Sequence, residues 1–190
     1  MRYAITMMGK IRIISGQWRG RKLPVADSPG LRPTGDRARE TLFNWLGQRT
    51  IGARCVDLFA GTGALGLEAA SRGAGAVDLV EKDRQLVRLI EDHTRAWPGI
   101  DKVRFIAADV LHWMATQPGG YDLIFIDPPF DQSLHQSVLD ALVEHGMLNP
   151  EALIYVECDA AEDPVAQASH SFRITREKRQ GGVMLRLLKV

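Results

Sequence analysis

Apolar residues along this chain fall into short continuous runs, which are separated by segments of helical periodicity. Continuous apolar runs that end at turn residues are typical of buried strands, and apolar positions three or four apart are typical of helices. The runs predict strands at 53–60, 76–83, 102–109, 121–127 and 152–159. The segments between them predict helices at 64–72, 84–97, 110–116 and 133–144. This alternation implies a mostly parallel sheet with helices on both faces.

The C-terminal part breaks this alternation. Runs at 171–179 and 183–190 are separated only by Gln180-Gly181-Gly182, with no helical segment between them. A glycine turn between two β runs predicts a hairpin. Its last strand should therefore run antiparallel to its neighbour. The sequence thus predicts a doubly wound α/β sheet that finishes in an antiparallel hairpin.

The N-terminal part predicts a hairpin arm followed by a helix. Two short β runs within 11–25 surround Gln17-Trp18-Arg19-Gly20, and a helix is expected to begin after Pro33. We expect residues 1–31 to form an extension and the arm, and residues 32–190 to form the main domain, together in one compact unit. The apolar faces expected for two of the helices are Ala38, Leu42, Trp45 and Leu46, and Leu86, Leu89, Ile90 and His93.

The composition is that of an ordinary globular protein. It is 45% hydrophobic and 25% charged, with a net charge of +1, which argues against disorder, collagen and coiled coil. No apolar run approaches the roughly 20 residues that span a bilayer, and the first ten residues fall short of a secretory signal. Cys55 and Cys158 lie in apolar runs and predict buried free thiols, so we expect a cytoplasmic protein. No cysteine or histidine cluster has the spacing of a zinc site, and no metal is expected.

The small net charge hides an asymmetry along the chain. Between residues 10 and 39, only Asp27 and Asp36 oppose the basic side chains of Lys10, Arg12, Arg19, Arg21, Lys22, Arg32, Arg37 and Arg39. The rest of the chain is acidic in balance. A basic arm on an acidic body indicates a polyanionic partner, although a solvated charged face explains the same pattern.

A glycine motif follows the first predicted strand of the sheet. Gly61-Thr62-Gly63-Ala64-Leu65-Gly66 is a G-x-G-x-x-G sequence that opens a helix, where the backbone can approach an anionic ligand. It fits a dinucleotide site, an S-adenosylmethionine site or a tight turn without ligand. Glu81 ends the second strand, where a carboxylate can accept from ribose hydroxyls. Asp109 ends the third, where it can accept from an adenine amino group while the Val110 N–H meets a ring nitrogen.

The fourth strand ends in Asp127-Pro128-Pro129-Phe130. Prolines cannot continue a sheet, so this sequence predicts a rigid corner at the same edge. The Asp127 carboxylate and the Pro128 carbonyl can accept both hydrogens of a nucleobase amino group, which favours charge developing on nitrogen as it attacks a methyl sulfonium. Phe130 offers a surface on which an extruded base could stack. The alternative is a plain turn with a buried phenylalanine.

The glycine loop, Glu81, Asp109 and the proline corner together resemble a class I S-adenosylmethionine-dependent methyltransferase of the amino-methylating kind. With RIISGQWRGRKL, RPTGDRARETLFNWL, DLFAGTGALGLEAASRGA and EALIYVE, the chain is similar to the RsmD family over nearly its whole length. The resemblance implies a Rossmann-like fold: a seven-stranded, mostly parallel sheet with an antiparallel C-terminal hairpin and a small N-terminal β-hairpin arm. It implies methylation of the N2 of a guanine in 16S ribosomal RNA, at position 966 in the usual numbering, with an assembling 30S subunit as partner.

The resemblance also implies roles for individual residues. S-adenosylmethionine is expected to be held by Asp57, Gly61, Thr62, Gly63, Glu81, Asp109, Val110 and Asp127. Catalysis is expected at Asp127, Pro128 and Phe130, with Pro129 and Phe130 against the guanine. RNA is expected to contact Arg12, Trp18, Arg19, Arg21, Lys22, Thr34 and Arg37. Trp18 either stacks on RNA or packs in the core. We expect a monomer.

Other functions stay open at this point. A DNA adenine-N6 or protein glutamine methyltransferase uses the same proline corner, but neither is expected to need the basic arm. An NAD-dependent oxidoreductase explains the glycine motif but leaves Asp127-Pro128-Pro129-Phe130 unexplained. A non-catalytic ribosome-assembly factor would bind ribosomal RNA through the arm without turnover.

Overall fold

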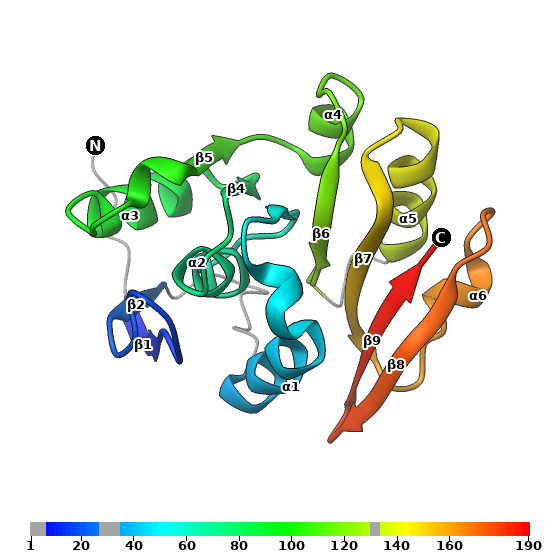
Figure 1. Cartoon of the computed structure of the whole chain (residues 1–190), viewed down its shortest axis with the longest axis horizontal. Helices are drawn as coiled ribbons and strands as arrows, with labels where there is room; N and C mark the ends of the chain where they lie inside the picture. The colour runs from blue at the N-terminus through cyan, green and yellow to red at the C-terminus, as the bar shows by residue number, and fades with distance from the viewer. Residues whose placement is uncertain (1–6, 27–34, 130–133) are drawn as a thin grey trace.

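The computed structural model describes residues 7–26, 35–129 and 134–190. Its centre is a seven-stranded sheet in the order β5-β4-β3-β6-β7-β9-β8 (Figure 1). These strands are β3 (Arg54–Asp57), β4 (Ala76–Glu81), β5 (Val103–Ala107), β6 (Tyr121–Ile126), β7 (Leu148–Asp159), β8 (Arg173–Gln180) and β9 (Val183–Lys189). β9 is antiparallel to both β7 and β8, and the remaining neighbours are parallel. The predicted parallel sheet and terminal hairpin are confirmed.

Helices cover both faces of the sheet, because side chains alternate between the faces along each strand. Cys55 of β3 packs into the core of one face, and the next residue, Val56, packs into the core of the other. The helices of the first face are α1 (Asp36–Leu46), α2 (Ala64–Ser71) and α3 (Arg84–Thr94), and those of the second are α4 (Val110–Met114) and α5 (His135–Glu144). Three short helical segments are not predicted from the sequence: η1 (Gly47–Thr50), η2 (Ile100–Lys102) and α6 (Pro164–Gln167).

Two helices bury most of the predicted face together with residues that were not predicted. The buried positions of α1 are Ala38, Arg39, Leu42, Phe43 and Leu46, and Trp45 is half-buried. Those of α3 are Leu86, Val87, Ile90 and Thr94, while Leu89 is half-buried and His93 is exposed. Thr94 can be buried because its hydroxyl donates to the Ile90 carbonyl oxygen (2.8 Å). His93 instead lies at the edge, with its Nε2 2.7 Å from the Lys22 carbonyl oxygen.

The N-terminal hairpin is confirmed as an element outside the main sheet. β1 (Met7–Arg12) and β2 (Lys22–Ala26) form a two-stranded antiparallel sheet, and residues 7–26 are called the arm below. The loop of the arm lies against the end of α2. The Gln17 N–H donates to the Ser71 carbonyl oxygen (2.8 Å), and the Trp18 N–H donates to Ser71 Oγ (2.9 Å). The arm therefore packs beside the sheet, as the sequence predicts.

Trp18 anchors the arm from inside the core. Its side chain is fully buried, its ring packs edge-on against Trp97 at 5.3 Å between centroids, and its Nε1–H donates to the Pro98 carbonyl oxygen (2.8 Å). The Lys102 Nζ lies 5.5 Å from the ring centroid. A buried indole combines a large apolar area with one satisfied donor. The prediction that Trp18 stacks on RNA is wrong, and its alternative, packing in the core, is confirmed.

Asp57 fastens α2 to the sheet from the end of β3. Its Oδ2 accepts the Gly66 N–H (3.0 Å). Gly66 can lie this close to the sheet only because it has no side chain, since a Cβ there would lie 2.2 Å from Leu79 Cδ2. Burial raises the pKa of Asp57 to about 7, the Gly66 N–H opposes this shift, and the charge of Glu81 adds to it. The Asp57 Oδ1 is buried without a hydrogen-bond partner among the described residues.

Replacing Trp18 by alanine should lower the free energy of unfolding by about 3–5 kcal/mol, because it leaves a cavity between the arm and the end of α3. Urea-induced unfolding, followed by circular dichroism, measures this loss. Trp45→Ala, which removes a half-buried indole from α1, should cost clearly less. A loss below about 1 kcal/mol for Trp18→Ala would contradict the packed position of the arm.

The stability of the chain should depend on pH through Asp57. The pKa of Asp57 is higher in the folded state than the ordinary value near 4, so between these two pH values the folded state holds a proton that the unfolded state releases. The stability contributed by the protonated Asp57 is therefore complete below about pH 4 and is lost as the pH rises to about 7. Asp57→Asn keeps an acceptor for the Gly66 N–H but removes this dependence. From pH 4 to pH 8, the unfolding free energy of the variant should rise by roughly 2–4 kcal/mol relative to that of the wild type, measured by urea unfolding at each pH. A pH-independent difference would contradict a proton-binding Asp57.

Candidate functional site

The groups predicted for the site meet at one edge of the sheet. β5, β4, β3 and β6 are adjacent and parallel, so their carboxyl ends lie side by side. The glycine motif follows β3, Glu81 ends β4, Asp109 follows β5 and Asp127 follows β6. In open α/β sheets this is the edge at which ligands bind.

The turn that follows β3 is fastened to both neighbouring strands. The Leu58 N–H donates to the Phe125 carbonyl oxygen of β6 (3.1 Å), and the Ala60 N–H donates to the Val80 carbonyl oxygen of β4 (2.9 Å). These two bonds extend the ladder beyond the last paired residue of β3. The glycine turn is therefore held directly between the ends of β4 and β6.

Glu81 and the glycine turn, twenty positions apart in the chain, are in direct contact. The Glu81 Oε2 accepts the Gly61 N–H (3.0 Å), and its Oε1 accepts the Asp83 N–H (2.9 Å). Gly61 and Gly63 have φ values of 51° and 75°, a conformation that favours glycine. Both glycines and Thr62 between them are buried. Each carboxylate oxygen can accept more than one hydrogen bond, so Glu81 can still accept from a ligand.

Asp109 lies beside Glu81 and begins α4. The Ala108 N–H donates to the Glu81 carbonyl oxygen (3.0 Å), which joins the ends of β4 and β5. Asp109 is exposed and is the N-cap of α4, where its Oδ1 accepts the His112 N–H (3.1 Å). Val110 follows as the first, buried residue of the helix. The capping bond uses one carboxylate oxygen and fixes the direction of the side chain.

The proline corner adjoins the glycine turn, because β6 pairs with β3. Asp127 and Pro129 are half-buried, and Pro128 is buried. Phe130 lies outside the described residues, as does Thr34.

Behind the corner lies a buried pair of residues on β7 that the sequence analysis does not assign. Tyr155 donates from its hydroxyl to Glu157 Oε2 (2.9 Å), and burial, together with the charges of Glu157 and Asp127, raises the pKa of Tyr155 well above its usual value. The His135 Nε2 lies 2.8 Å from the Glu157 carbonyl oxygen. The chain on both sides of the corner is thus tied to β7. Two polar residues two positions apart in an apolar strand are the signal for such a pair.

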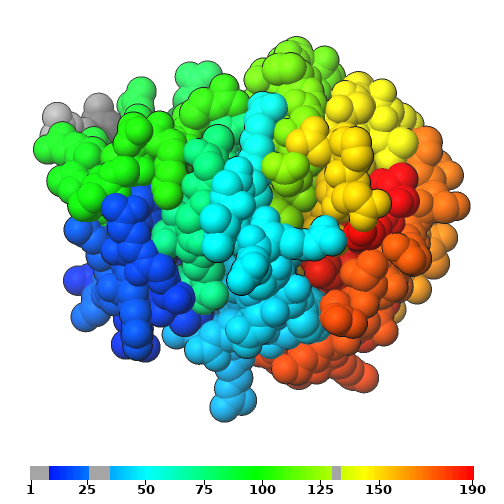
Figure 2. Space-filling view, in the orientation of Figure 1, coloured from blue at the N-terminus to red at the C-terminus, as the bar shows by residue number. Residues whose placement is uncertain are grey.

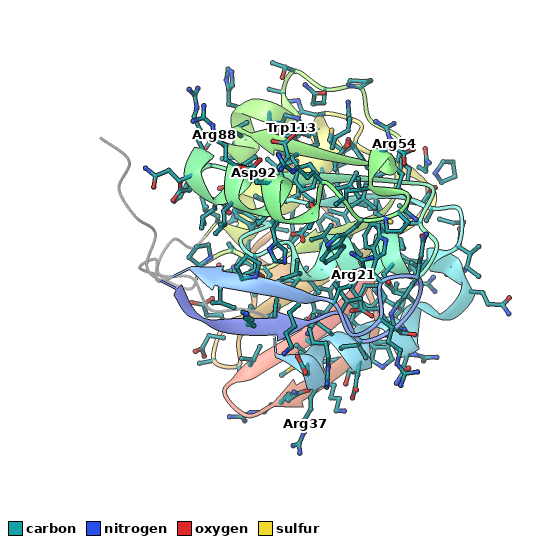
Figure 3. The ribbon with its side chains drawn as sticks, turned by 90° about the vertical axis from the view of Figure 1, so that its left-hand side faces the viewer. Arg21, Arg37, Arg54, Arg88, Asp92 and Trp113 are labelled. Atoms are coloured by element: carbon teal, nitrogen blue, oxygen red, sulfur yellow. The ribbon has the colours of Figure 1, made fainter. Side chains whose placement is uncertain are left out.

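The cations predicted to contact RNA are at the surface. Arg12, Arg19, Arg21 and Lys22 of the arm are exposed, as is Arg37 near the start of α1 (Figure 3). The Arg21 guanidinium lies 5.1 Å from the Trp97 ring centroid, so part of this cation is held against the body of the protein. Figure 2 shows the arm at the surface, with α1 between it and the β8–β9 hairpin.

The described residues also show whether the chain has a metal-binding cluster or a helix that could span a membrane. Within them, no group of three or more histidine, cysteine, aspartate or glutamate residues is placed to hold a metal ion. Among the helices of the same residues, none is long and apolar enough to cross a membrane.

Comparison with known proteins gives consistent results. The family model described as Conserved hypothetical protein 95 matches residues 11–189. The chain is 46% identical over 180 residues to ribosomal RNA small subunit methyltransferase D of Escherichia coli strain K12, covering 94% of this chain and 89% of that protein. It is 41% identical over 183 residues to the protein of the same name in Haemophilus influenzae, covering 94% and 93%.

A solved structure has the same fold over nearly the full length. The Escherichia coli protein yhhF superimposes with a TM-score of 0.84 at 40% sequence identity, covering 95% of this chain and 97% of that one. The family model begins within β1, at residue 11, and so includes most of the arm as well as the sheet. The chain therefore belongs to the family described as Conserved hypothetical protein 95, which is the RsmD family that the sequence motifs indicate.

Proposed function

We propose that this protein transfers a methyl group from S-adenosylmethionine to the exocyclic N2 of a guanine in 16S ribosomal RNA, at position 966 in the usual numbering. We further propose that the substrate is an assembling 30S subunit in the cytoplasm. The observation that carries the proposal is the parallel pairing of β3 with β6, whose adjacent carboxyl ends lead into the glycine turn and into Asp127-Pro128. The names of the relatives support ribosomal RNA of the small subunit as the substrate class.

The residues at the carboxyl edge fit the proposed cofactor. Glu81 can accept from both ribose hydroxyls while it holds the Gly61 N–H. Asp109 and the Val110 N–H can pair with the adenine edge. The Asp57 carboxylate has an unpartnered buried oxygen beneath the glycine turn, and a nearby cation would favour its ionised form. When bound, S-adenosylmethionine supplies an electrophilic methyl group on a sulfonium.

The proline corner supplies acceptors for the amino group of the guanine. The nitrogen lone pair is delocalised into the ring, so the free amine is a weak nucleophile. The Asp127 carboxylate and the Pro128 carbonyl can accept its two hydrogens and stabilise the positive charge that develops on nitrogen as the N–C bond forms and the S–C bond breaks. One proton then leaves the nitrogen for Asp127 or for water.

The arm supplies the contacts that distinguish ribosomal RNA from smaller substrates. Five exposed cations in a short hairpin, which include Lys10, can neutralise several phosphates, and such contacts fix the register of a nucleic acid without reading its sequence. A protein glutamine methyltransferase leaves this arm without a role, whereas the phosphates of DNA and RNA would both contact it. The arm thus favours a nucleic-acid substrate among enzymes that share the proline corner, and the names of the relatives point to RNA.

Replacing Asp127 by alanine should reduce methyl transfer from tritiated S-adenosylmethionine to 30S subunits by about a hundredfold or more, as expected when one charge-stabilising group of the transition state is lost. Asp127→Asn should keep part of the activity, because the amide oxygen still accepts a hydrogen bond. Asp101→Ala, an exposed acid on η2, is the control and should behave like the wild type. Wild-type turnover in Asp127→Ala would refute the catalytic role.

Replacing Arg19 and Lys22 by alanine should weaken the binding of 16S ribosomal RNA transcribed in vitro. The slope of log K against log salt should become shallower by about 0.7–0.9 for each lost phosphate contact, measured by filter binding. Arg88→Ala removes an exposed cation of α3 outside the arm (Figure 3) and should leave the slope unchanged. Equal slopes for the arm variant and the wild type would show that the arm does not contact phosphates.

A further inference from the structure

Glu68 is a fully buried carboxylate of α2 that holds the loop of the arm. Its Oε2 accepts the Ile14 N–H (2.7 Å), and its Oε1 accepts the Ser15 N–H (3.0 Å). A buried carboxylate needs such donors, because an unpaired charge is costly to remove from water. The backbone of the arm thus supplies part of the environment that keeps Glu68 buried.

Two arginines complete the surroundings of Glu68. The Arg72 Nε donates to Oε1 (2.7 Å), and the Arg39 Nη1 lies 3.5 Å from Oε2. Arg39 is also fully buried, and its Nη2 donates to the Arg12 carbonyl oxygen (2.9 Å) and to Asp36 (2.6 Å). These contacts join α1, α2 and the arm into one polar cluster.

Gly16 makes a second close contact between the arm and α2. It has a φ of 81°, and a Cβ at this position would lie 1.9 Å from the Ser71 carbonyl oxygen. A side chain there would have to move the loop away from α2. Gly20, on the other side of the same loop, has a φ of 82°, but a Cβ there would meet nothing within 4 Å. The two glycines have the same backbone conformation, so alanine would be strained at either position, but only at Gly16 would it also clash with α2.

α2 connects these contacts directly with the glycine turn. The helix has 8 residues, begins after Gly63 and ends at Ser71, so it is about 12 Å long. Glu68 and Ser71 lie in its second half. The position of the arm relative to the carboxyl edge of the sheet is therefore set by one short, buried helix.

We propose that Glu68 is a positioning residue for the RNA substrate: it holds the cations of the arm at a fixed place relative to the methyl-transfer site. This inference rests on the proposed function, because it takes the arm as the RNA-binding element. A loosened arm must be ordered when RNA binds, which weakens binding without changing the groups at the reacting nitrogen. Loss of this contact should thus raise KM for RNA and leave kcat nearly unchanged.

The variants Gly16→Ala, Gly20→Ala and Glu68→Gln test this proposal on the full chain. We would measure KM and kcat for methylation of 30S subunits, and the affinity for S-adenosylhomocysteine by calorimetry. Gly16→Ala should raise KM for the subunit about tenfold or more, with kcat and the cofactor affinity within about twofold of wild type. Gly20→Ala has the same strain without the clash and should change KM much less. Glu68→Gln should act like Gly16→Ala, and a folded Glu68→Gln with wild-type KM would overturn the role of Glu68. If Glu68→Gln does not fold, an unchanged KM in Gly16→Ala overturns it, because RNA binding would then not depend on a fixed place of the arm on α2.

Each outcome separates the positioning role from the proposed function. No methylation by the wild-type chain would overturn the proposed function, and this inference with it. If the wild type methylates the subunit but Gly16→Ala and Gly20→Ala have equal KM values, the positioning role alone would be overturned. So would a loss of cofactor affinity in Gly16→Ala that matches the change in KM, because the contact would then only support the fold.

Discussion

The position of β3 between two parallel neighbours is the constraint on which the site depends. A turn that leaves the carboxyl end of β3 can bond only to the ends of β4 and β6, and both bonds are present. The acids that end those strands, Glu81 and Asp127, are brought to the turn by the same geometry. The site is thus a consequence of strand order and direction, and its chemistry comes from the residue type at each strand end.

α2 owes its position to two buried carboxylates more than to helix propensity. All its residues are buried, it has only 8 of them, and a helix of that length is marginal by itself in water. Asp57 bonds to the Gly66 N–H and holds the helix to β3, while Glu68 holds the arm and α1 to the helix. Burying an acid is costly; donors from the arm, α1 and the end of α2 compensate that cost for Glu68, whereas Asp57 has one bonded oxygen and a pKa raised by burial. The same helix therefore connects the glycine turn with the surface cations.

The sequence predicts the strands, their direction and the edge at which Gly61, Glu81, Asp109 and Asp127 meet, because apolar runs and strand-end polar residues are local signals. It is wrong about His93, which is exposed, and it leaves Trp18 open between the core and the RNA surface. Periodicity identifies an apolar stripe but not which polar atoms will find partners when they are buried. The indole of Trp18 finds the Pro98 carbonyl from another element. The same is true of Glu68, whose partners Ile14 and Ser15 lie 54 and 53 positions away in the chain, whereas Tyr155 and Glu157 are only two positions apart on β7.

The burial of Trp18 also bears on how RNA would be recognised. In the segment Trp18–Lys22 the aromatic residue is inside and the cations are outside, so the arm offers charge and hydrogen bonds but no aromatic stacking surface. Charge contacts hold a phosphate backbone in register and do not distinguish one base from another. Under the proposed function, the choice of base is then made outside the arm, and the two acceptors of the proline corner match a base with an exocyclic amine. A rigid arm and a selective corner are useful together only if the distance between them is fixed, which is the condition that the packed α2 meets.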